Sequence, residues 1–115
     1  MIGNSIEVLE YAGDGYSKVM SYGAWRVAII NYAERFDERN LTRLERHLLT
    51  DEVFVLLEGN ATLISDGEKY PMEKGKMYNV KAGTWHAIAV SRDAKVLIIE
   101  NDDTCIDNTE YKQIN

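Results

Sequence analysis

The 115-residue chain has little of the residues that cross-link a protein, interrupt its strands or give it positive charge. Its one cysteine, Cys105, cannot form a disulfide within the chain. Its one proline, Pro71, is compatible with a β-rich fold if it lies at the end or edge of a strand. Lys and Arg number only 13 against 19 Asp and Glu, and they are scattered along the chain. Because a nucleic-acid surface needs a basic patch, we expect no nucleic-acid partner.

Long hydrophobic runs are absent as well. No apolar run approaches the roughly 20 residues that cross a membrane, so we expect no membrane partner. The first residues, MIGNSIEVLE, lack the basic start and the long apolar core of a signal peptide. Together with the lone cysteine, this makes a cytoplasmic location the simplest prediction. The length suffices for one core and not for two, so residues 1–115 are predicted to form a single domain.

The chain does contain many short β-prone segments, which are separated by glycine-containing turns. The clearest are residues 25–30, 53–57 and 95–100, which are apolar and rich in β-branched side chains. Asp66-Gly67 predicts a tight hairpin turn, because these residues readily take positive φ. The pattern predicts an all-β sandwich or small barrel. We expect the remaining strands at residues 5–11, 18–22, 61–65, 69–72, 77–80 and 85–90.

Residues 31–47 fit two different structures. Their apolar side chains lie near helical spacing, so periodicity alone permits a short helix over residues 34–46. The alternative is a charged loop that passes into a strand near Leu41. Propensity does not decide between the helix and the loop.

The residues that precede the strand at 53–57 carry the clearest chemical signal. In extended conformation, side chains alternate between faces, so Arg43, Glu45 and His47 would share one face. His47 is one of only two histidines in the chain. Three chemically active side chains that lead into a buried strand indicate a functional site.

This stretch resembles the first sequence motif of the cupin superfamily. His47 is followed after four residues by Glu52 and after six more by Gly59, which is the spacing of the second half of that motif. The match covers about residues 39–59. Two positions depart from it: Arg39 replaces the leading glycine, and Glu45 replaces the first histidine of the family's His-x-His.

A second stretch, at about residues 75–90, resembles the second cupin motif. Gly75, Gly83 and His86 fit its spacing, whereas Lys81 replaces its proline and Val90 its closing asparagine. The two stretches and the segment between them cover somewhat under half of the chain. Each motif alone is a weak signal, but together they make the chain similar to small, single-domain cupins.

The resemblance implies a fold and a metal site. The fold would be the cupin double-stranded β-helix, or jelly-roll barrel, which favours the loop over the helix in residues 34–46. His47, Glu52 and His86 would bind one divalent ion, with Glu45 able to serve as a fourth ligand. Such a set suits Fe, Mn, Zn or Ni. The alternative is that both histidines are hydrogen-bonded cavity residues without a metal.

The polar residues beside the predicted ligands allow several roles. Glu45 could be a metal ligand, a catalytic general base, or the partner of Arg43 in an ion pair. Arg43 could bind a substrate carboxylate or phosphate through two parallel hydrogen bonds, or it could be an ordinary solvated arginine. The sequence leaves these roles open.

Two hypotheses for the function follow from the resemblance. The first is a metal-dependent enzyme of the isomerase, dioxygenase or lyase type that acts on a small polar metabolite, such as a sugar derivative or a small organic acid. The second is a small-molecule-binding or sensing module without metal and without turnover. Fold alone does not decide between them.

The strand at 53–57 is apolar on both faces. If Phe54 and Leu56 point inward, then Val53, Val55 and Leu57 point outward and need a second cover. The β-prone N-terminal segment also needs a partner edge. Symmetric association commonly covers such surfaces, so the sequence predicts a homodimer.

Overall fold

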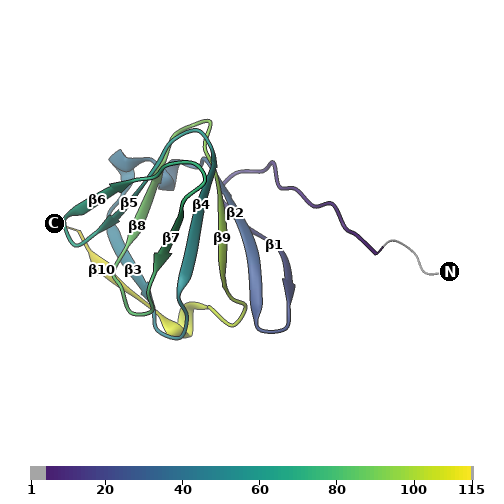
Figure 1. Ribbon diagram of the computed structural model, residues 1–115. Helices are drawn as coiled ribbons and strands as arrows, with labels where there is room; N and C mark the ends of the chain where they lie inside the picture. Colours follow the sequence, from purple (N-terminus) through teal and green to yellow (C-terminus); the bar gives the residue numbers. More distant parts are fainter. Residues whose placement is uncertain (1–4, 115) are drawn as a thin grey trace.

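The computed structural model describes residues 5–114, which form ten strands and three short 3₁₀ helices. The strands build two layers that face each other (Figure 1). The strands are β1 (Tyr16–Tyr22), β2 (Trp25–Asn31), β3 (Arg43–His47), β4 (Glu52–Glu58), β5 (Ala61–Ser65), β6 (Glu68–Pro71), β7 (Met77–Val80), β8 (Ala87–Val90), β9 (Lys95–Asn101) and β10 (Thr109–Gln113). The 3₁₀ helices are η1 (Glu34–Phe36), η2 (Glu38–Asn40) and η3 (Ile106–Asn108).

One layer is a five-stranded antiparallel sheet, and the other is assembled from two smaller sheets. The five-stranded sheet has the order β1-β2-β9-β4-β7. The smaller sheets have the orders β6-β5-β8 and β10-β3. An isolated bridge between Glu45 and His86 joins β3 to the segment that leads into β8. In this bridge each residue donates its backbone N–H to the carbonyl oxygen of the other at 2.8 Å.

The core lies between the two layers and follows from strand alternation. On β4, Phe54 and Leu56 are buried against the inward residues of β2, β9 and β8. Glu52 lies on the same face of β4 and is also buried. The inward face of β4 is therefore apolar along most of its length and carries a carboxylate at one end of the barrel.

Two turns require glycine. In the β5–β6 hairpin, Asp66 and Gly67 both have positive φ, 43° and 85°, as the predicted two-residue turn needs. Gly59 has φ +70°, and a Cβ there would lie 2.7 Å from the Cα of Ala94. Any side chain at Gly59 would therefore collide with the turn that precedes β9.

The predicted all-β class is confirmed, and several strands begin and end where the sequence indicated. Residues 61–65 and 77–80 form β5 and β7 with the predicted bounds. Residues 34–46 form η1 and η2 and then enter β3, so the loop interpretation is right and the helix is not formed.

The strand predicted at residues 5–11 is wrong. In the structure these residues form no strand, and the segment before Tyr11 runs away from the barrel, with Ile6 and Val8 largely exposed (Figure 1). Alternation of apolar and polar residues is present there, but a strand also needs a neighbouring edge with free N–H and C=O groups. In addition, β10 was not predicted, because its sequence TEYKQ has little apolar content.

Among residues 5–114, the structure contains no helix that is both long and apolar enough to span a membrane.

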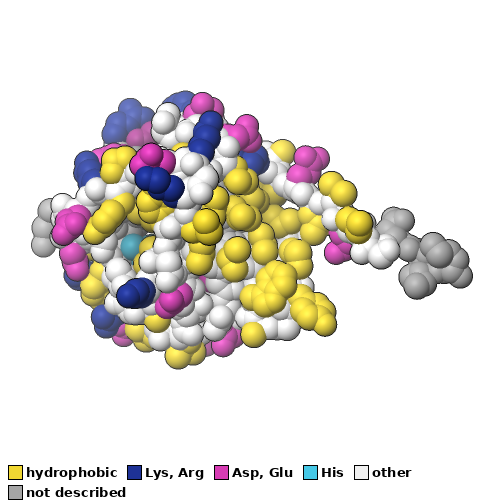
Figure 2. Space-filling view, viewed as in Figure 1, with side chains coloured by type: hydrophobic (Ala, Val, Ile, Leu, Met, Phe, Trp, Pro, Cys, Tyr) yellow, Lys and Arg dark blue, Asp and Glu magenta, His cyan; other side chains and the backbone are white. Residues whose placement is uncertain are grey.

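The outer face of the five-stranded sheet is apolar. Residues that pair across the sheet share a face, and the pairs Val27–Ile99, Val53–Ile99 and Val55–Leu97 place these side chains away from the core. Figure 2 shows hydrophobic side chains gathered over β9, β4 and β2 on this face. We call it the outer apolar face; it consists of Trp25, Val27, Val53, Val55, Met77, Leu97 and Ile99.

The homodimer predicted from the sequence remains a proposal, and the outer apolar face is the surface we assign to it. Ile99→Glu places a charge at the centre of this face and is expected to convert a dimer into monomers. Multi-angle light scattering at micromolar concentration measures the change. Tyr70→Glu, on the exposed strand β6, is the control and should leave the mass unchanged. A 13.1 kDa species for the unmodified chain would contradict the proposal.

Candidate metal centre

A cavity of about 540 Å³ opens at one end of the barrel. Phe54, Ile88 and Ile98 form part of its wall, and its polar lining includes residues of both motif stretches. Figure 2 shows a histidine side chain at the bottom of an opening in the surface. The barrel therefore holds a hollow in which polar groups lie against an apolar wall, which is a usual form of small-molecule site.

Three residues converge in this cavity from three separate segments of the chain. His47 ends β3, Glu52 begins β4, and His86 directly precedes β8. Nε2 of His86 lies 3.0 Å from Oε1 of Glu52, and Nε2 of His47 lies 3.2 Å from the same oxygen. All three side chains are buried. Residues of the two motif stretches thus bring both imidazole rings into contact with the same carboxylate oxygen.

The other nitrogen of each imidazole is held by a group outside this cluster. Nδ1 of His86 lies 2.9 Å from the carbonyl oxygen of Thr84, which can only accept, so Nδ1 carries the proton. Nδ1 of His47 lies 3.0 Å from Oγ1 of Thr109 on β10. Such outer partners fix ring orientation and direct Nε2 inward, as they do for metal-binding histidines.

Glu45 lies nearer the mouth of the cavity. Its Oε2 is 3.7 Å from Nε2 of His47, and its side chain is 41% exposed. Glu45, His47 and His86 each offer one ligand atom within 4.8 Å of the others. The bridge to His86 causes this placement, because directly opposed residues of a ladder share a face.

Arg43 lines the mouth of the cavity and does not pair with Glu45. Its guanidinium lies over the Tyr111 ring, with Cζ 3.8 Å from the ring centroid. Among the described residues, its side chain has no carboxylate partner. The ion-pair alternative for Glu45 is therefore not formed, and the Arg43 donors are free to face a ligand. Arg35, which the sequence did not single out, also lines the mouth and stacks on Phe36.

Glu100 is the second residue that sequence reasoning missed. It lies on β9 beside Glu52, one position beyond the pair Val53–Ile99, and it is 5% exposed. The sequence did contain a signal for Glu100. Side chains alternate along a strand, so positions 96, 98 and 100 share one face, and Glu100 lies on the inward face together with Val96 and Ile98. A buried carboxylate in an otherwise apolar inward row marks a functional position.

The cluster shifts the pKa values of its members in opposite directions. Burial lowers the pKa of His47 and His86, but the hydrogen bonds and charge of Glu52 outweigh it, so both pKa values lie above the usual range. Burial raises the pKa of Glu52, but its two histidine partners bring that pKa below the usual value. The pKa of Glu100 is raised, first by burial and then by the negative charge of Glu52.

The residues present fit a divalent metal ion. Two inward Nε2 atoms and a buried carboxylate form the nitrogen and oxygen set that borderline divalent metals prefer. Their outer partners resemble those that orient metal-binding imidazoles. The donor chemistry and its orientation therefore both suit a metal, and the open cavity leaves room for a further ligand.

The family model for the cupin domain matches residues 39–100, more than half of the chain. The chain belongs to the cupin family. The cupin barrel expected from the two motif stretches is thereby confirmed. No curated protein sequence gives a significant match.

Solved structures show the same fold at low sequence identity. A cupin-2 domain protein from Shewanella frigidimarina is 18% identical, with a TM-score of 0.59 over 79% of this chain and 84% of that one. A variant of Pac13 from Streptomyces with uridine is 8% identical, with a TM-score of 0.69 over 99% and 93%. KdgF from Halomonas is 15% identical, with a TM-score of 0.60 over 83% and 87%. At these identities the likeness shows the fold alone.

The pKa shifts predict how the stability of metal-free protein depends on pH. The raised histidine pKa values contribute stability below about pH 6.5, and this is lost as the pH rises through the folded-state values. The lowered pKa of Glu52 contributes stability above about pH 4.3, and this is lost as the pH falls. We therefore expect chelator-treated protein to be most stable at mildly acidic pH and to lose thermal stability toward pH 9.

Thermal unfolding of chelator-treated protein across this pH range measures the effect. Glu52→Gln removes the anion that raises both histidine pKa values. The thermal stability of this variant should therefore fall less between pH 6 and pH 9 than that of the unmodified chain. The control is Glu58→Gln, at the far end of β4, which should keep the profile of the unmodified chain. An unmodified chain that is equally stable at pH 6 and pH 9 would contradict this account.

Proposed function

We propose that this chain binds one divalent metal ion with His47, Glu52 and His86, and that it binds a small, oxygen-rich metabolite in the same cavity. The observation that carries the proposal is the convergence of both Nε2 atoms on Oε1 of Glu52, at 3.2 and 3.0 Å, in the buried part of an open cavity. Fe, Mn, Zn and Ni are the metals that such a set suits.

The residues around the cation site support a polar ligand. The guanidinium groups of Arg43 and Arg35 lie at the mouth, where each stacks on an aromatic ring. A guanidinium held in this way presents donors that match a carboxylate or phosphate. An apolar ligand would leave these groups unpaired, at about 1–3 kcal/mol for each desolvated polar group. The preferred ligand therefore carries several oxygens and an anionic or hydroxyl group.

One structural neighbour gives this ligand class a precedent in the same fold. Pac13 is described as a nucleoside dehydratase, and its Streptomyces variant holds uridine. Uridine carries several hydroxyl and carbonyl oxygens. The cupin barrel therefore accommodates a compound of the class that we propose here.

We propose that the chain is an enzyme in which Glu45 is the general base. A metal bound there would polarise a substrate oxygen. Glu45 lies between the histidines and the mouth, with its side chain 41% exposed, so a ligand in the cavity can reach its carboxylate. Its Oε2 lies 3.7 Å from Nε2 of His47, so the base lies directly beside the proposed metal ligands.

The second candidate is a binding or sensing module without metal. Its support is that Glu52 already forms a hydrogen bond with His86 and lies 3.2 Å from Nε2 of His47, so these buried groups compensate one another. Such a module would still bind a polar ligand through the arginines at the mouth. Metal content and turnover separate the two candidates.

Metal occupancy is the first test. Elemental analysis of protein purified without chelator should give one divalent ion per chain. His47→Ala and His86→Ala should each abolish this occupancy, because each removes a nitrogen ligand from a small set. The surface variant Glu58→Gln should keep it. Divalent metal near zero after attempted reconstitution would leave only the metal-free candidate.

Ligand choice is the second test. A thermal-shift screen should show stabilisation by small organic acids, sugars and sugar phosphates, and none by apolar compounds. Arg43→Ala should reduce this stabilisation, because it removes a guanidinium from the mouth. Arg92→Ala is a matched control, since Arg92 also stacks on a ring, that of Tyr32, outside this cavity. Stabilisation by hydrophobic compounds alone would refute the ligand class.

A further inference from the structure

Glu100 is a buried carboxylate that no cupin motif includes. It reaches the cavity from β9 beside Glu52 on β4, and both side chains are almost completely buried. Two adjacent carboxylates in a low-dielectric interior repel each other, and burial of each charge is costly unless it is paired. Their proximity therefore requires compensation from nearby groups.

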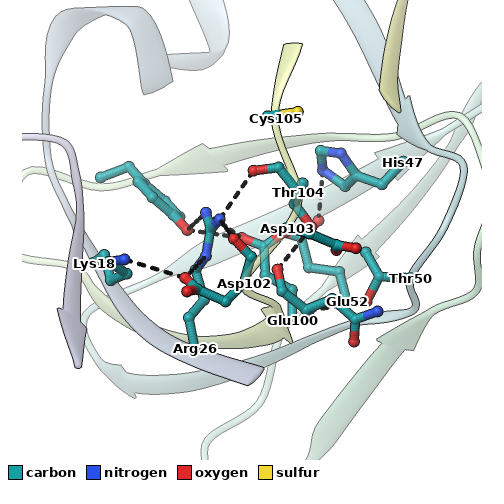
Figure 3. A network of polar contacts seen from close by, with 12 residues as sticks. Lys18, Arg26, His47, Thr50, Glu52, Glu100, Asp102, Asp103, Thr104 and Cys105 are labelled. Carbon is teal, nitrogen blue, oxygen red and sulfur yellow. Dashed lines mark hydrogen bonds and ion pairs between the residues drawn. The ribbon is translucent and has the colours of Figure 1, made fainter. Parts of the chain in front are cut away.

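Among the described residues, the polar partners of Glu100 contact only one of its two carboxylate oxygens. The Tyr16 hydroxyl donates to Oε2 at 2.7 Å, and Nη1 of Arg26 lies 3.9 Å from the same oxygen. Arg26 donates in turn to Tyr16 and to Asp102. In Figure 3, Lys18 and Arg26 lie to one side of Glu100, and Glu52 and His47 lie to the other. Tyr16 and Arg26 thus hold the Glu100 carboxylate from the side opposite Glu52 and His47.

The other oxygen, Oε1, is buried and has no hydrogen-bond partner. Buried polar atoms in native structures are almost always satisfied, so an unpartnered carboxylate oxygen indicates a ligand. The side chain lines the cavity, on the side where His47 and Glu52 lie. A cation is the ligand that would satisfy this oxygen and also offset the charge of both carboxylates.

The distances suit a single ion. His47, Glu52 and Glu100 each offer one ligand atom, and these atoms lie within 4.8 Å of one another. Ligands at about 2.0–2.2 Å from an ion lie at most about 4.4 Å apart. The separations are therefore of the order that the ligands of one ion have, and side-chain rotation can bring the three atoms onto it.

Glu45 and Glu100 compete for the same histidine. His47 belongs to both groups of ligand atoms, and its Nδ1 is engaged with Thr109, so it has one nitrogen to offer. It can therefore bind one ion, not two. Glu45 is 41% exposed and close to the solvent, whereas the side chain of Glu100 is 3% exposed and has an unsatisfied oxygen. Metal binding satisfies a buried group only at Glu100.

We propose that Glu100 is the carboxylate ligand that accompanies Glu52 in the metal site of this chain, and that Glu45 is left free to contact the substrate. The proposal rests on the metal binding proposed above. It explains how the chain keeps a full ligand set although Glu45 replaces the first histidine of the motif. Tyr16 and Arg26 would then be positioning residues that orient Glu100.

The test compares Glu100→Gln with Glu45→Gln in full-length protein stripped of metal by a chelator. Calorimetric titration with Zn²⁺ and, separately, with Mn²⁺ gives the Kd of each variant. Glu100→Gln should weaken binding by roughly tenfold or more, as loss of an important group at a metal site does. Glu45→Gln, which removes the same charge nearer the mouth, should bind nearly as well as the unmodified chain.

Thermal unfolding separates a ligand from a structural residue. Without metal, Glu100→Gln should be at least as stable as the unmodified chain, because it removes a carboxylate that repels Glu52. Its stabilisation by added metal should be smaller. If Glu100→Gln fails to fold, Glu100→Asp decides, since it keeps the charge but withdraws the carboxylate by one methylene and should also weaken binding.

The outcomes distinguish the two proposals. If the unmodified chain binds neither ion, the metal-binding function itself fails. If the unmodified chain binds and Glu100→Gln binds equally well, the assignment of Glu100 alone is overturned. The same holds if Glu45→Gln loses binding and Glu100→Gln keeps it, which would place the second carboxylate at the mouth.

Discussion

The arrangement of Glu45, His47 and His86 depends on one pair of backbone hydrogen bonds, those that join Glu45 to His86. They attach β3 and β10 to the sheet that contains β8 and so complete the layer opposite the five-stranded sheet. Opposed residues in a ladder share a face, and residues two apart on a strand do as well. Glu45, His47 and His86 therefore face the same space because of this bridge.

The interior of this barrel combines an apolar core with a cluster of buried charged and polar side chains. Most of the core is apolar, yet Glu52 and Glu100 are buried side by side at one end of it. His47 and His86 offset the negative charge of Glu52, and the Tyr16 hydroxyl donates a hydrogen bond to one of the two carboxylate oxygens of Glu100. Burying polar groups in this way costs stability, and proteins keep such arrangements mainly where they bind or react.

The cavity is chemically divided along its depth. Its buried part holds imidazoles and carboxylates, which suit a cation, and its mouth holds the guanidinium groups of Arg35 and Arg43. A ligand that spans both parts would place an oxygen at the cation and an anionic or hydroxyl group at the mouth. Glu45 lies between the two parts, where the carbon skeleton of such a ligand would pass.

Local sequence determined most of the strands. Alternation and turn residues predict β5 and β7 with their observed bounds. These strand predictions succeed because side-chain alternation and turn geometry depend only on neighbours in the chain. The resemblance to the two cupin motifs points to His47, Glu52 and His86, and the structure brings these three residues together.

Tertiary structure alone decided the rest. Residues 5–11 alternate like a strand, yet no sheet edge lies beside them, whereas polar β10 is a strand because β3 offers it an edge. Thr109 then reaches His47, and the register of β4 with β9 brings Glu100 beside Glu52. These contacts join residues far apart in the sequence, so they depend on strand pairing and register, which no local pattern specifies.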